Sequence, residues 1–308
     1  MSAGDNRLDV VVVNFHSAGL IARTIEIARN FAGAGTRVIL VDNSPGDGAA
    51  NIARSAAPDA SVIENAVNHG YAAAVNQAFM ESDAEFVLLI NPDVERLSGS
   101  YADVLEAFRD PLAGAVAVRL VNTDGTLQPN CISAPRPFDL ISEDVALAER
   151  FPTWRRPRLY RMLDWDHGEA RRVDAARGAC IFLRRAAIED VGLFDEHFFV
   201  YYEETDWLIR AKRRGWRTIF LPSVEAVHAS AGSSPDIRSP HSLLLLESQH
   251  RYARKHFGAM TTGLLRAAQL GIDTARLARY AVAGRAEARA AAVDRIRVHL
   301  TMRAPRPS

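Results

Sequence analysis

The chain has 308 residues, 48% of them hydrophobic and 24% charged, which is typical of a globular protein that can bury a sizeable core. Its 37 basic and 37 acidic residues cancel, but residues 251–308 carry a formal charge of +9 and the remainder −9. An acidic body without a pattern of stacking aromatic residues disfavours nucleic acid as a partner.

Cysteine content and hydropathy indicate the compartment. Cys131 and Cys180 have no metal-ligand spacing and cannot form a disulfide framework, so a reducing cytoplasm is expected. The stretch from Met1 to Asp9 is polar and lacks the features of a signal peptide. No run of 18 apolar residues exists, so we expect no membrane-spanning helix.

Short apolar, β-branched runs alternate with helical spacing in the first 90 residues. Strands are predicted at 8–13, 37–41, 61–64 and 85–90, and helices at 20–31, 49–57 and 71–82. This alternation predicts βαβ units, and therefore an α/β fold with a mostly parallel, Rossmann-like sheet flanked by helices.

The pattern loosens after residue 93. Residues 122–172 show no clear period and are rich in Pro, Arg and Trp, which predicts a binding loop or a lid. Helices are predicted at 101–108, 185–191 and 203–214, strands at 113–120, 178–183, 218–221 and 224–227, and a long helical region from 243 onward.

Polar turns follow the predicted strands. In open α/β sheets ligands bind beyond the carboxyl ends of the strands. The residues in these turns are Asn14, Asp42, Asn43, Asn68, Gly70, Asn91 and Asp93. Any one of them is explained by helix capping or a turn, but several at one sheet edge indicate a ligand site.

A nucleotide bound at this edge would lack a glycine-rich phosphate loop, because neither G-x-G-x-x-G nor a Walker pattern is present. Its diphosphate would need another counter-charge. Asp93 at a strand end suggests Mg²⁺ or Mn²⁺ held by oxygen ligands. His228, after a predicted strand, either adds an imidazole ligand or is a structural histidine.

Five carboxylates lie among aromatic residues between Phe194 and Trp207. Three of them, Glu203, Glu204 and Asp206, occupy four positions, so mutual repulsion and apolar neighbours should raise at least one pKa. Such a group is suited to act as a general base. The alternative is the solvated first turn of a helix, where acidic residues are favourable.

These motifs together resemble family 2 glycosyltransferases of the GT-A fold, and among them the rhamnosyltransferase-type members that act on lipid-linked or surface glycans. The resemblance covers residues 8–258. The motifs that carry it are Asn14, Val41-Asp42-Asn43-Ser44, Asn68-x-Gly70-Tyr71-Ala72-x-x-x-Asn76, Asn91-Pro92-Asp93, Gly178-x-Cys180, Phe194-Asp195-Glu196, Glu203-Glu204-x-Asp206 and Pro222-x-x-x-x-x-His228.

The resemblance implies a role for each matching residue. It implies that Asp42 contacts the nucleobase and that Asp93, preceded by Asn91 instead of an acid, is the last residue of a metal-binding motif with His228 as a late ligand. Glu204 matches the base, with Glu203 and Asp206 as alternatives. Nucleotide-sugar-binding residues are implied at Asn14, Asp42, Asn43, Asn68, Gly70, Asn76 and Asn91, and acceptor-binding residues at Asp195, Glu196 and Trp207.

The implied activity is metal-dependent, inverting transfer of a sugar from a nucleoside-diphosphate donor, with dTDP-L-rhamnose as the first expectation. The implied acceptor is a hydroxyl of a glycan or of a polyprenyl-diphosphate-linked glycan. UDP-galactofuranose or UDP-glucose is an alternative donor. A non-catalytic glycan- or nucleotide-binding module stays open, and a nucleotidyltransferase is disfavoured because no basic, glycine-rich triphosphate loop follows the first strand.

The C-terminal region is predicted to be a basic helical extension, residues 259–308, following a catalytic domain of residues 1–258. Four arginines, Arg276, Arg279, Arg285 and Arg289, alternate with apolar residues. A basic amphipathic helix can lie on the anionic inner face of the plasma membrane. The alternative is a helix packed on the catalytic domain or at a homodimer interface. We therefore expect a cytoplasmic protein with peripheral membrane contact through this region.

Overall fold

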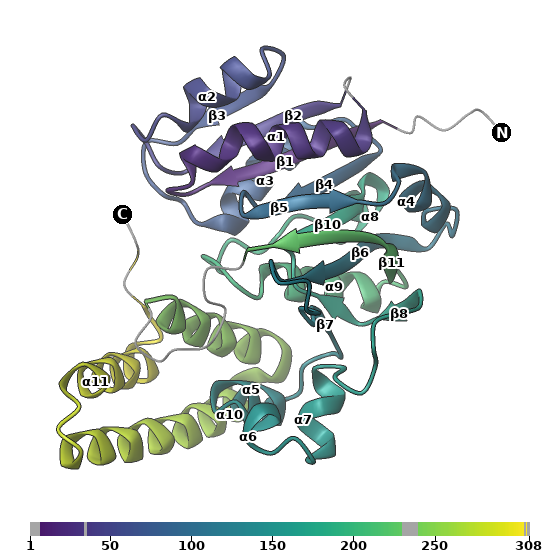
Figure 1. Cartoon of the computed structure of the whole chain (residues 1–308). Helices are drawn as coiled ribbons and strands as arrows, with labels where there is room; N and C mark the ends of the chain where they lie inside the picture. Colours follow the sequence, from purple (N-terminus) through teal and green to yellow (C-terminus); the bar gives the residue numbers. More distant parts are fainter. Residues whose placement is uncertain (1–6, 34–35, 230–239, 305, 307–308) are drawn as a thin grey trace.

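The computed structural model describes residues 7–33, 36–229, 240–304 and 306, so the stretch Met1–Asn6 lies outside the described residues. It confirms the α/β class, with a central sheet between helices and a long helical hairpin, α10 and α11, at one end (Figure 1). The strands are β1 (Leu8–Asn14), β2 (Arg37–Asp42), β3 (Ser61–Glu64), β4 (Phe86–Ile90), β5 (Val94–Ser98), β6 (Ala113–Val121), β7 (Cys131–Ile132), β8 (Arg171–Val173), β9 (Ala175–Ala176), β10 (Cys180–Arg184) and β11 (Arg217–His228). The helices are α1 (Ala18–Ala32), α2 (Ala49–Ala56), α3 (Tyr71–Glu81), α4 (Tyr101–Ala107), α5 (Pro137–Asp144), α6 (Leu147–Arg150), α7 (Arg155–Tyr160), α8 (Arg185–Val191), α9 (Glu203–Arg213), α10 (Pro240–Val282) and α11 (Ala286–Thr301).

The central sheet brings one set of strand ends together. Within the described residues it has nine strands in the order β3-β2-β1-β4-β10-β6-β11-β5, with β8 beside β11. β1 to β4, β6 and β11 point one way, and β5, β8 and β10 point the other. Because β10 is antiparallel to β4, its first residue, Cys180, pairs with the last residue of β4, Ile90. The start of β10 therefore lies at the carboxyl edge of the parallel strands.

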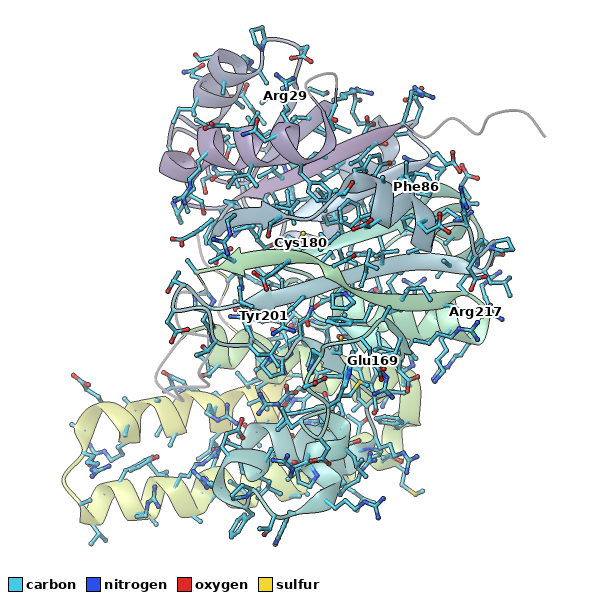
Figure 2. All side chains as sticks on the ribbon, turned by 45° about the vertical axis from the view of Figure 1, so that its right-hand side comes forward. Arg29, Phe86, Glu169, Cys180, Tyr201 and Arg217 are labelled. Carbon is cyan, nitrogen blue, oxygen red and sulfur yellow. The ribbon has the colours of Figure 1, made fainter. Side chains whose placement is uncertain are left out.

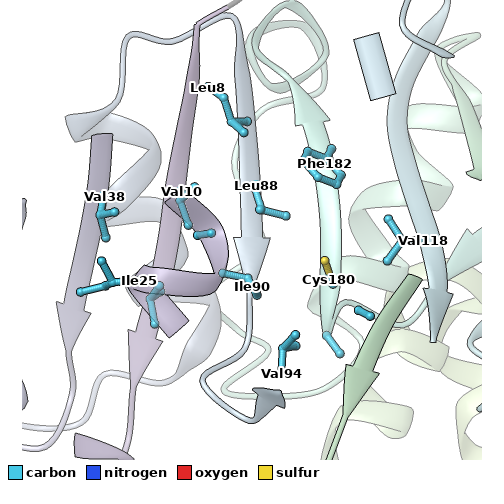
Figure 3. Packing of buried hydrophobic residues seen from close by; sticks show 14 of the residues in the cluster. Leu8, Val10, Ile25, Val38, Leu88, Ile90, Val94, Val118, Cys180 and Phe182 are labelled. Carbon is cyan, nitrogen blue, oxygen red and sulfur yellow. The ribbon is translucent and has the colours of Figure 1, made fainter. Parts of the chain in front are cut away.

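The buried faces of the sheet explain why the strand sequences are continuously apolar. Alternate residues point to opposite faces, and helices cover both. Val10, Leu88 and Phe182 pack with Ile25 of α1 on one face (Figure 3). On the other face Val11 and Leu89 belong to a second cluster with α3, α8 and α9. Packing on both faces of the sheet therefore fixes the position of the strands whose carboxyl ends form this edge.

Three expectations for the middle of the chain were incomplete. Residues 122–172 are not an unstructured loop, because they contain α5, α6, α7, β7 and β8. These elements have two to eight residues, too few to show a period in the sequence. β5 was not predicted. The two short strands expected around Pro222 form one strand, β11, whose pairing with β6 shifts between Leu221 and Glu225. A proline has no N–H for the ladder, which suits such an irregularity.

The C-terminal helices pack on the body. Gly258, with φ 81° and ψ 178°, interrupts α10 at the residue where we expected the domain boundary. Before this break Tyr252 packs in a cluster with Leu140 of α5 and with Tyr202, and Tyr201 lies between the sheet and the hairpin (Figure 2). Whether residues 259–308 form a separate domain stays a prediction. Within the described residues, no helix combines the length and apolar character needed to cross a membrane.

One arginine of the predicted basic surface is used inside the protein. Arg276 forms an ion pair with Asp273 at 2.7 Å, and its side chain is mostly buried. Arg295 of α11 bonds the same aspartate and also pairs with Asp144 of α5. Arg276 also donates to the carbonyl of Asp144 at 3.2 Å, so it joins α10 to α5 of the body. Arg279, Arg285 and Arg289 are exposed near the hairpin tip.

Candidate active site

The loops after β1 and β2 lock together at the carboxyl edge. Nδ2 of Asn14 donates hydrogen bonds to Oδ1 of Asp42 at 2.8 Å and to Oδ2 of Asp47 at 2.9 Å. The N–H groups of Ser17 and Ser44 in turn donate to Asn14 Oδ1 and Asp42 Oδ1. Asn14 and Asp42 are both buried. Their side chains are therefore held in one orientation, and their contact with a nucleotide stays a prediction.

Asn43 links the second loop to the turn before α3. Its Nδ2 donates to the carbonyl of Gly70 at 3.2 Å, and its Oδ1 accepts a hydrogen bond from Asn65 at 2.8 Å. Asn43 is buried and both ends of its amide are bonded within the protein. Asn43 therefore joins two loops, and its contact with a nucleotide stays a prediction. Asn68 is partly exposed, and its Oδ1 accepts from the N–H of Gly70.

Gly70 brings a distant loop onto the start of α3. Its φ of +88° is strained for any residue with a Cβ, and a Cβ there would lie 2.5 Å from the carbonyl oxygen of Phe199. The same oxygen accepts a hydrogen bond from the N–H of Tyr71 at 2.7 Å. The absence of a side chain at position 70 therefore lets the loop of residues 194–202, which leads to Glu203, approach the turn before α3.

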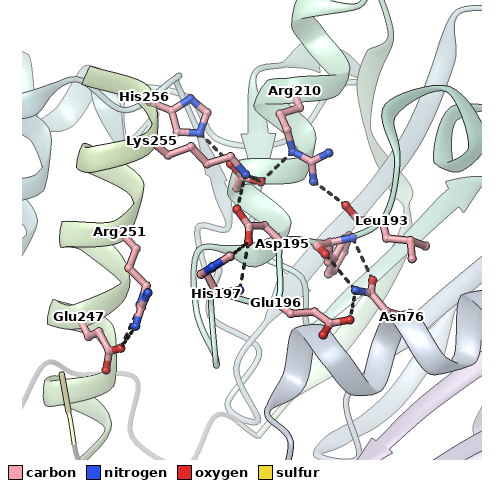
Figure 4. Close-up of polar contacts among 12 residues, drawn as sticks. Asn76, Leu193, Asp195, Glu196, His197, Arg210, Glu247, Arg251, Lys255 and His256 are labelled. Carbon is pink, nitrogen blue, oxygen red and sulfur yellow. Dashed lines mark hydrogen bonds and ion pairs between the residues drawn. The ribbon is translucent and has the colours of Figure 1, made fainter. Parts of the chain in front are cut away.

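Asn76 holds the other end of that loop. Its Nδ2 donates to the carbonyl of Phe194 and to Oε1 of Glu196, both at 2.9 Å, and its Oδ1 accepts from the N–H of Phe194 (Figure 4). Asn76 is buried. Its whole amide anchors the loop that contains Phe194 and Glu196, and its expected place beside the nucleotide stays a prediction. Glu196 is exposed apart from this contact.

Asp93 and His228 come together from β11 and the turn after β4. His228 Nε2 lies 3.1 Å from Asp93 Oδ1, and both are partly exposed. Gln128 donates from Nε2 to Asn122, which turns its Oε1 toward His228 Nδ1 at 2.8 Å. The contact with Gln128 assigns a ring proton to Nδ1, and in the neutral imidazole the lone pair of Nε2 is then directed at the carboxylate.

This pair fits a divalent cation. With a second ring proton on Nε2, the contact is a hydrogen-bonded ion pair with Asp93; in the neutral ring, the Nε2 lone pair and the carboxylate oxygen would both face a cation bound between them. Two ligands held about 2.1 Å from one Mg²⁺ or Mn²⁺ at a right angle lie about 3 Å apart, close to the spacing found. The hydrogen bond from Gln128 is the kind of outer contact that orients a metal-binding histidine. Within the described residues, no group of three or more His, Cys, Asp or Glu side chains is arranged for a metal ion.

Glu203 and Glu204 begin α9 after two strained residues. Tyr201 and Tyr202 have φ values of 68° and 69°, which is unusual for bulky side chains and typical of constrained functional sites. Burial, and then the neighbouring Glu204, raise the pKa of Glu203 well above its ordinary value. Glu204 is less buried, and its Oε1 accepts from the N–H of Gly178, ahead of β10, at 3.3 Å.

Tyr71 lies beside the loop that leads to the acid pair. Its N–H donates to the carbonyl of Phe199, four residues ahead of Glu203. Burial raises the pKa of Tyr71, and the charges of Glu203, Glu204 and Asp93 raise it further. The motif Gly70-Tyr71 was visible in the sequence, but nothing in its spacing indicated this contact.

Asp206 is a structural anion in this structure. It is fully buried and accepts from Arg210 and His256 at 2.8 Å and from Lys255 at 2.9 Å (Figure 4). Burial alone would raise the pKa of Asp206, but His256, Lys255 and Arg210 outweigh it and lower the pKa. Three donors make it a poor proton acceptor, so its expected role as an alternative base is corrected.

Lys255 also bonds Asp195, in the loop before α9. Its Nζ donates to Asp195 Oδ2 at 2.6 Å, and His197 contacts the other oxygen of the same carboxylate. Burial would raise the pKa of Asp195, but the hydrogen bonds from Lys255 and His197 lower it to about 2. Asp195 is thus held as an anion between the loop and α10. Its contact with an acceptor stays a prediction.

Trp207 was expected to bind the acceptor and instead lies in the core. It is fully buried, belongs to the cluster under α3 and α8, and donates from Nε1 to the carbonyl of Gly192 at 2.8 Å. Residues three and four positions apart share a helix face, so Trp207 lies on the same buried face of α9 as Glu203, one turn further into the core.

Several contributors were not found from the sequence. Gln128 orients His228 from a region without periodicity, and Lys255 and His256 come from a helix that was assigned only by its composition. No local signal identifies them, because their partners are brought close by the tertiary fold. The backbone of Asn91, by contrast, is fixed at the sheet edge. Its N–H donates to the carbonyl of Ala179, which joins the end of β4 to the start of β10.

A sheet edge with fixed polar loops, an Asp–His pair and a buried acid pair suits an enzyme that binds a phosphorylated donor beside a general base. The chain belongs to glycosyl transferase family 2, whose family model matches residues 9–192. It is accordingly a nucleotide-sugar-dependent glycosyltransferase.

Similar proteins agree with this assignment. The N-acetylglucosaminyl-diphospho-decaprenol L-rhamnosyltransferase of Mycobacterium tuberculosis is 32% identical over 239 residues, which cover 72% of this chain and 76% of that protein. The low-salt glycan biosynthesis hexosyltransferase Agl10 of Haloferax volcanii is 25% identical over 174 residues, covering 55% of this chain and 52% of that protein.

Solved structures support the fold. The mannosyltransferase PcManGT from Pyrobaculum calidifontis, in complex with GDP-Man and Mn²⁺, aligns with a TM-score of 0.54 at 18% identity and covers 96% of this chain and 87% of its own. GalNAc-T7 with UDP, GalNAc and Mn²⁺ aligns with a TM-score of 0.53 at 13% identity, covering 80% of this chain and 48% of its own. The likeness confirms the expected GT-A fold.

Proposed function

We propose that the chain transfers a sugar, with inversion, from a nucleoside-diphosphate donor to a hydroxyl of a lipid-linked or cell-surface glycan. The best candidate for the donor is dTDP-L-rhamnose. The single observation that carries the proposal is that the Asp93–His228 contact and Glu204, bonded to Gly178 ahead of β10, both lie at the carboxyl edge of the sheet. This arrangement places a leaving-group site next to a base.

The sugar and the acceptor are proposed from the relative in Mycobacterium tuberculosis. Its name states an L-rhamnosyltransferase that acts with an N-acetylglucosaminyl-diphospho-decaprenol. Identity of 32% across most of both chains supports the same type of reaction here. UDP-galactofuranose and UDP-glucose remain alternative donors, because the contacts that select a base or a sugar involve only a few atoms.

The donor nucleotide would lie against the first loops. Asp42, with its carboxylate fixed by Asn14 and Ser44, is proposed to face the nucleobase. Asn68 and Asn91 are partly exposed and are proposed to contact the nucleotide or the sugar. The buried residues Asn43 and Asn76 would support these contacts through the loops that they hold.

Asp93 and His228 are proposed to hold Mg²⁺ or Mn²⁺. The bound cation would neutralise negative charge on the diphosphate leaving group. Both structurally similar glycosyltransferases are complexes with Mn²⁺, which supports the choice of a divalent metal. Gln128 would keep Nε2 of His228 free for the ligand position. With Asn91 in place of a second acid, this site has one carboxylate and one imidazole.

Glu204 is proposed as the general base. An acceptor hydroxyl is a poor nucleophile, so a carboxylate that removes its proton during attack lowers the barrier. Burial raises the pKa of Glu203, and Glu204 is the less buried residue of the pair, with its Oε1 beside the N–H of Gly178. The hydroxyl oxygen forms the new bond to the anomeric carbon while the bond to the diphosphate breaks on the opposite side, which inverts that carbon.

The main competing interpretation is a non-catalytic module that binds a nucleotide or a glycan. The test is to incubate the protein with dTDP-rhamnose, UDP-galactofuranose or UDP-glucose, with Mg²⁺ or Mn²⁺ and a lipid-linked N-acetylglucosamine acceptor, and to measure release of nucleoside diphosphate. We expect acceptor-dependent release of dTDP and a β-to-α or α-to-β change at the anomeric carbon by NMR. Binding of donor without release in any combination would contradict catalysis.

A further inference from the structure

Large apolar side chains are exposed on the α5–α7 region. Phe151 and Trp154 lie between α6 and α7 and are 45% and 48% exposed, with ring centroids 4.7 Å apart and an interplanar angle of 18°. Leu159 of α7 and Phe138 of α5 are exposed to a similar extent. The three helices lie together at the end of the molecule that also carries α10 and α11 (Figure 1).

The part of this region that contains α6 and α7 is basic, whereas α5 is acidic. Residues 147–161 contain five arginines and one acidic residue, Glu149, a formal charge of +4. Arg156, Arg158 and Arg161 have carboxylate partners. Arg150 and Arg155 are exposed, and their side chains have no carboxylate partner within the part of the chain that the structure describes. These two cations flank the stacked rings.

We propose that this aromatic–arginine surface, made of Phe138, Arg150, Phe151, Trp154, Arg155 and Leu159, docks on an anionic phospholipid bilayer. Tryptophan and phenylalanine are favourable at the level of the lipid headgroups, where a ring is partly dehydrated and its edge stays near water. Unpaired arginines are attracted by anionic lipids, with a gain of about fivefold in binding for each one near the surface. The surface combines both features in one short segment.

The surface is connected to the acceptor side of the site. Glu143 of α5 accepts a hydrogen bond from the hydroxyl of Tyr202 at 2.7 Å and pairs with Arg177. Tyr202 directly precedes Glu203, and Arg177 precedes Gly178, which contacts Glu204. Docking through α5–α7 would therefore set the acid pair at a fixed height above the bilayer. The inference rests on the proposed function only in that a lipid-linked acceptor is presented at a membrane.

This surface differs from the one expected from the sequence, which was the C-terminal arginine helix. There Arg276 is held in the interior by Asp273, and the exposed Arg279, Arg285 and Arg289 lie near the hairpin tip beside Val282, without an exposed aromatic cluster. The two surfaces can be separated by mutation, because they belong to different elements.

The test is co-sedimentation of the full chain with phosphatidylcholine vesicles that contain or lack phosphatidylglycerol. We expect binding to the anionic vesicles and a loss of about tenfold or more in F151S/W154S, from removal of two interfacial rings. R150E/R155E should lose at least as much, since it reverses both charges. Leu112→Ser is the matched control: Leu112 is 43% exposed on the connection between α4 and β6, and we expect no change.

Three results would overturn the inference. The first is wild-type binding in both double variants. The second is loss of binding only in R279E/R285E/R289E, which would assign the contact to the hairpin. The third is self-association of the wild type that depends on Trp154 without binding to vesicles, which would make the surface a protein interface. Nucleoside-diphosphate release with a water-soluble acceptor, which needs no membrane, tests the proposed function separately.

Discussion

Nε2 of His228 lies 3.1 Å from Oδ1 of Asp93, and Gln128 holds the opposite side of the imidazole ring at 2.8 Å. The three residues come from β11, the turn after β4 and the segment after β6. None of these residues alone would make a metal site. Their arrangement follows from a sheet that places β5 and β6 on either side of β11.

Removing this arrangement should weaken metal binding. We expect His228→Ala to abolish Mn²⁺-dependent binding of dTDP and Gln128→Leu to lower Mn²⁺ affinity about 10- to 100-fold, because the ring loses its orientation. Isothermal titration of Mn²⁺ in the presence of dTDP measures both. His197→Ala is the control, since His197 also pairs with an aspartate but is exposed and at another site. Equal Mn²⁺ affinity in His228→Ala and His197→Ala would contradict the metal assignment.

Gly70→Ala should be destabilising beyond the cost of its backbone angle. The added Cβ would lie 2.5 Å from the carbonyl oxygen of Phe199 and would push the loop that contains Phe199 away from α3. Gly33→Ala shares a positive φ, at +108°, but its Cβ would meet nothing within 4 Å. By urea denaturation we expect the free energy of unfolding to fall by about 1 kcal/mol in Gly33→Ala and by about 3 kcal/mol in Gly70→Ala. Similar losses in the two variants would show that the loop tolerates the side chain.

Asp206→Asn tests the correction of a predicted base to a structural anion. Its removal leaves Lys255, His256 and Arg210 without their shared carboxylate, which should cost about 3–5 kcal/mol in the free energy of unfolding. Asp190→Asn breaks an exposed pair with Arg214 and should cost about 1 kcal/mol or less. Chemical denaturation compares them. A stable Asp206→Asn protein that has lost only catalysis would restore Asp206 as a candidate base.

Glu203→Gln should stabilise the protein at neutral pH. A carboxyl whose pKa is raised on folding keeps a proton that the unfolded chain has released, so the wild-type free energy of unfolding falls as the pH rises above about 4.5. The variant lacks this term, and its advantage should grow from pH 4.5 upward. Glu26→Gln, at an exposed position of α1, should show no such growth. A difference that does not change between pH 4.5 and 8 would contradict burial of the Glu203 carboxyl.

Much of the fold could be predicted because the first 90 residues carry their own signals. The apolar strands and the helices between them differ in period, and the polar turns after β1, β2 and β4 mark the strand ends. Elements such as α6 and α7 were missed because a helix of four or six residues has too few positions to show a 3.6-residue period.

The site was predicted unevenly for a related reason. Residue types and motif order identified Asp93, His228 and the acid pair, but they do not reveal which way a side chain points. Asn76 and Trp207 carry polar atoms that suit a ligand, and both are bonded inside the protein. Lys255 and Gln128 could not be found, because their partners are distant in the sequence and meet only in the folded chain.

The most direct test of the account compares Glu204→Gln with the wild type in acceptor-dependent release of dTDP from dTDP-rhamnose. We predict a fall in kcat of about 10²- to 10⁴-fold, the usual contribution of a general base. Affinity for dTDP and Mn²⁺ should be unchanged, because Glu204 is proposed to face the acceptor and Asp93–His228 are proposed to face the diphosphate. A Glu204→Gln enzyme that keeps kcat within about tenfold of the wild type would contradict the assignment of the base to this acid pair.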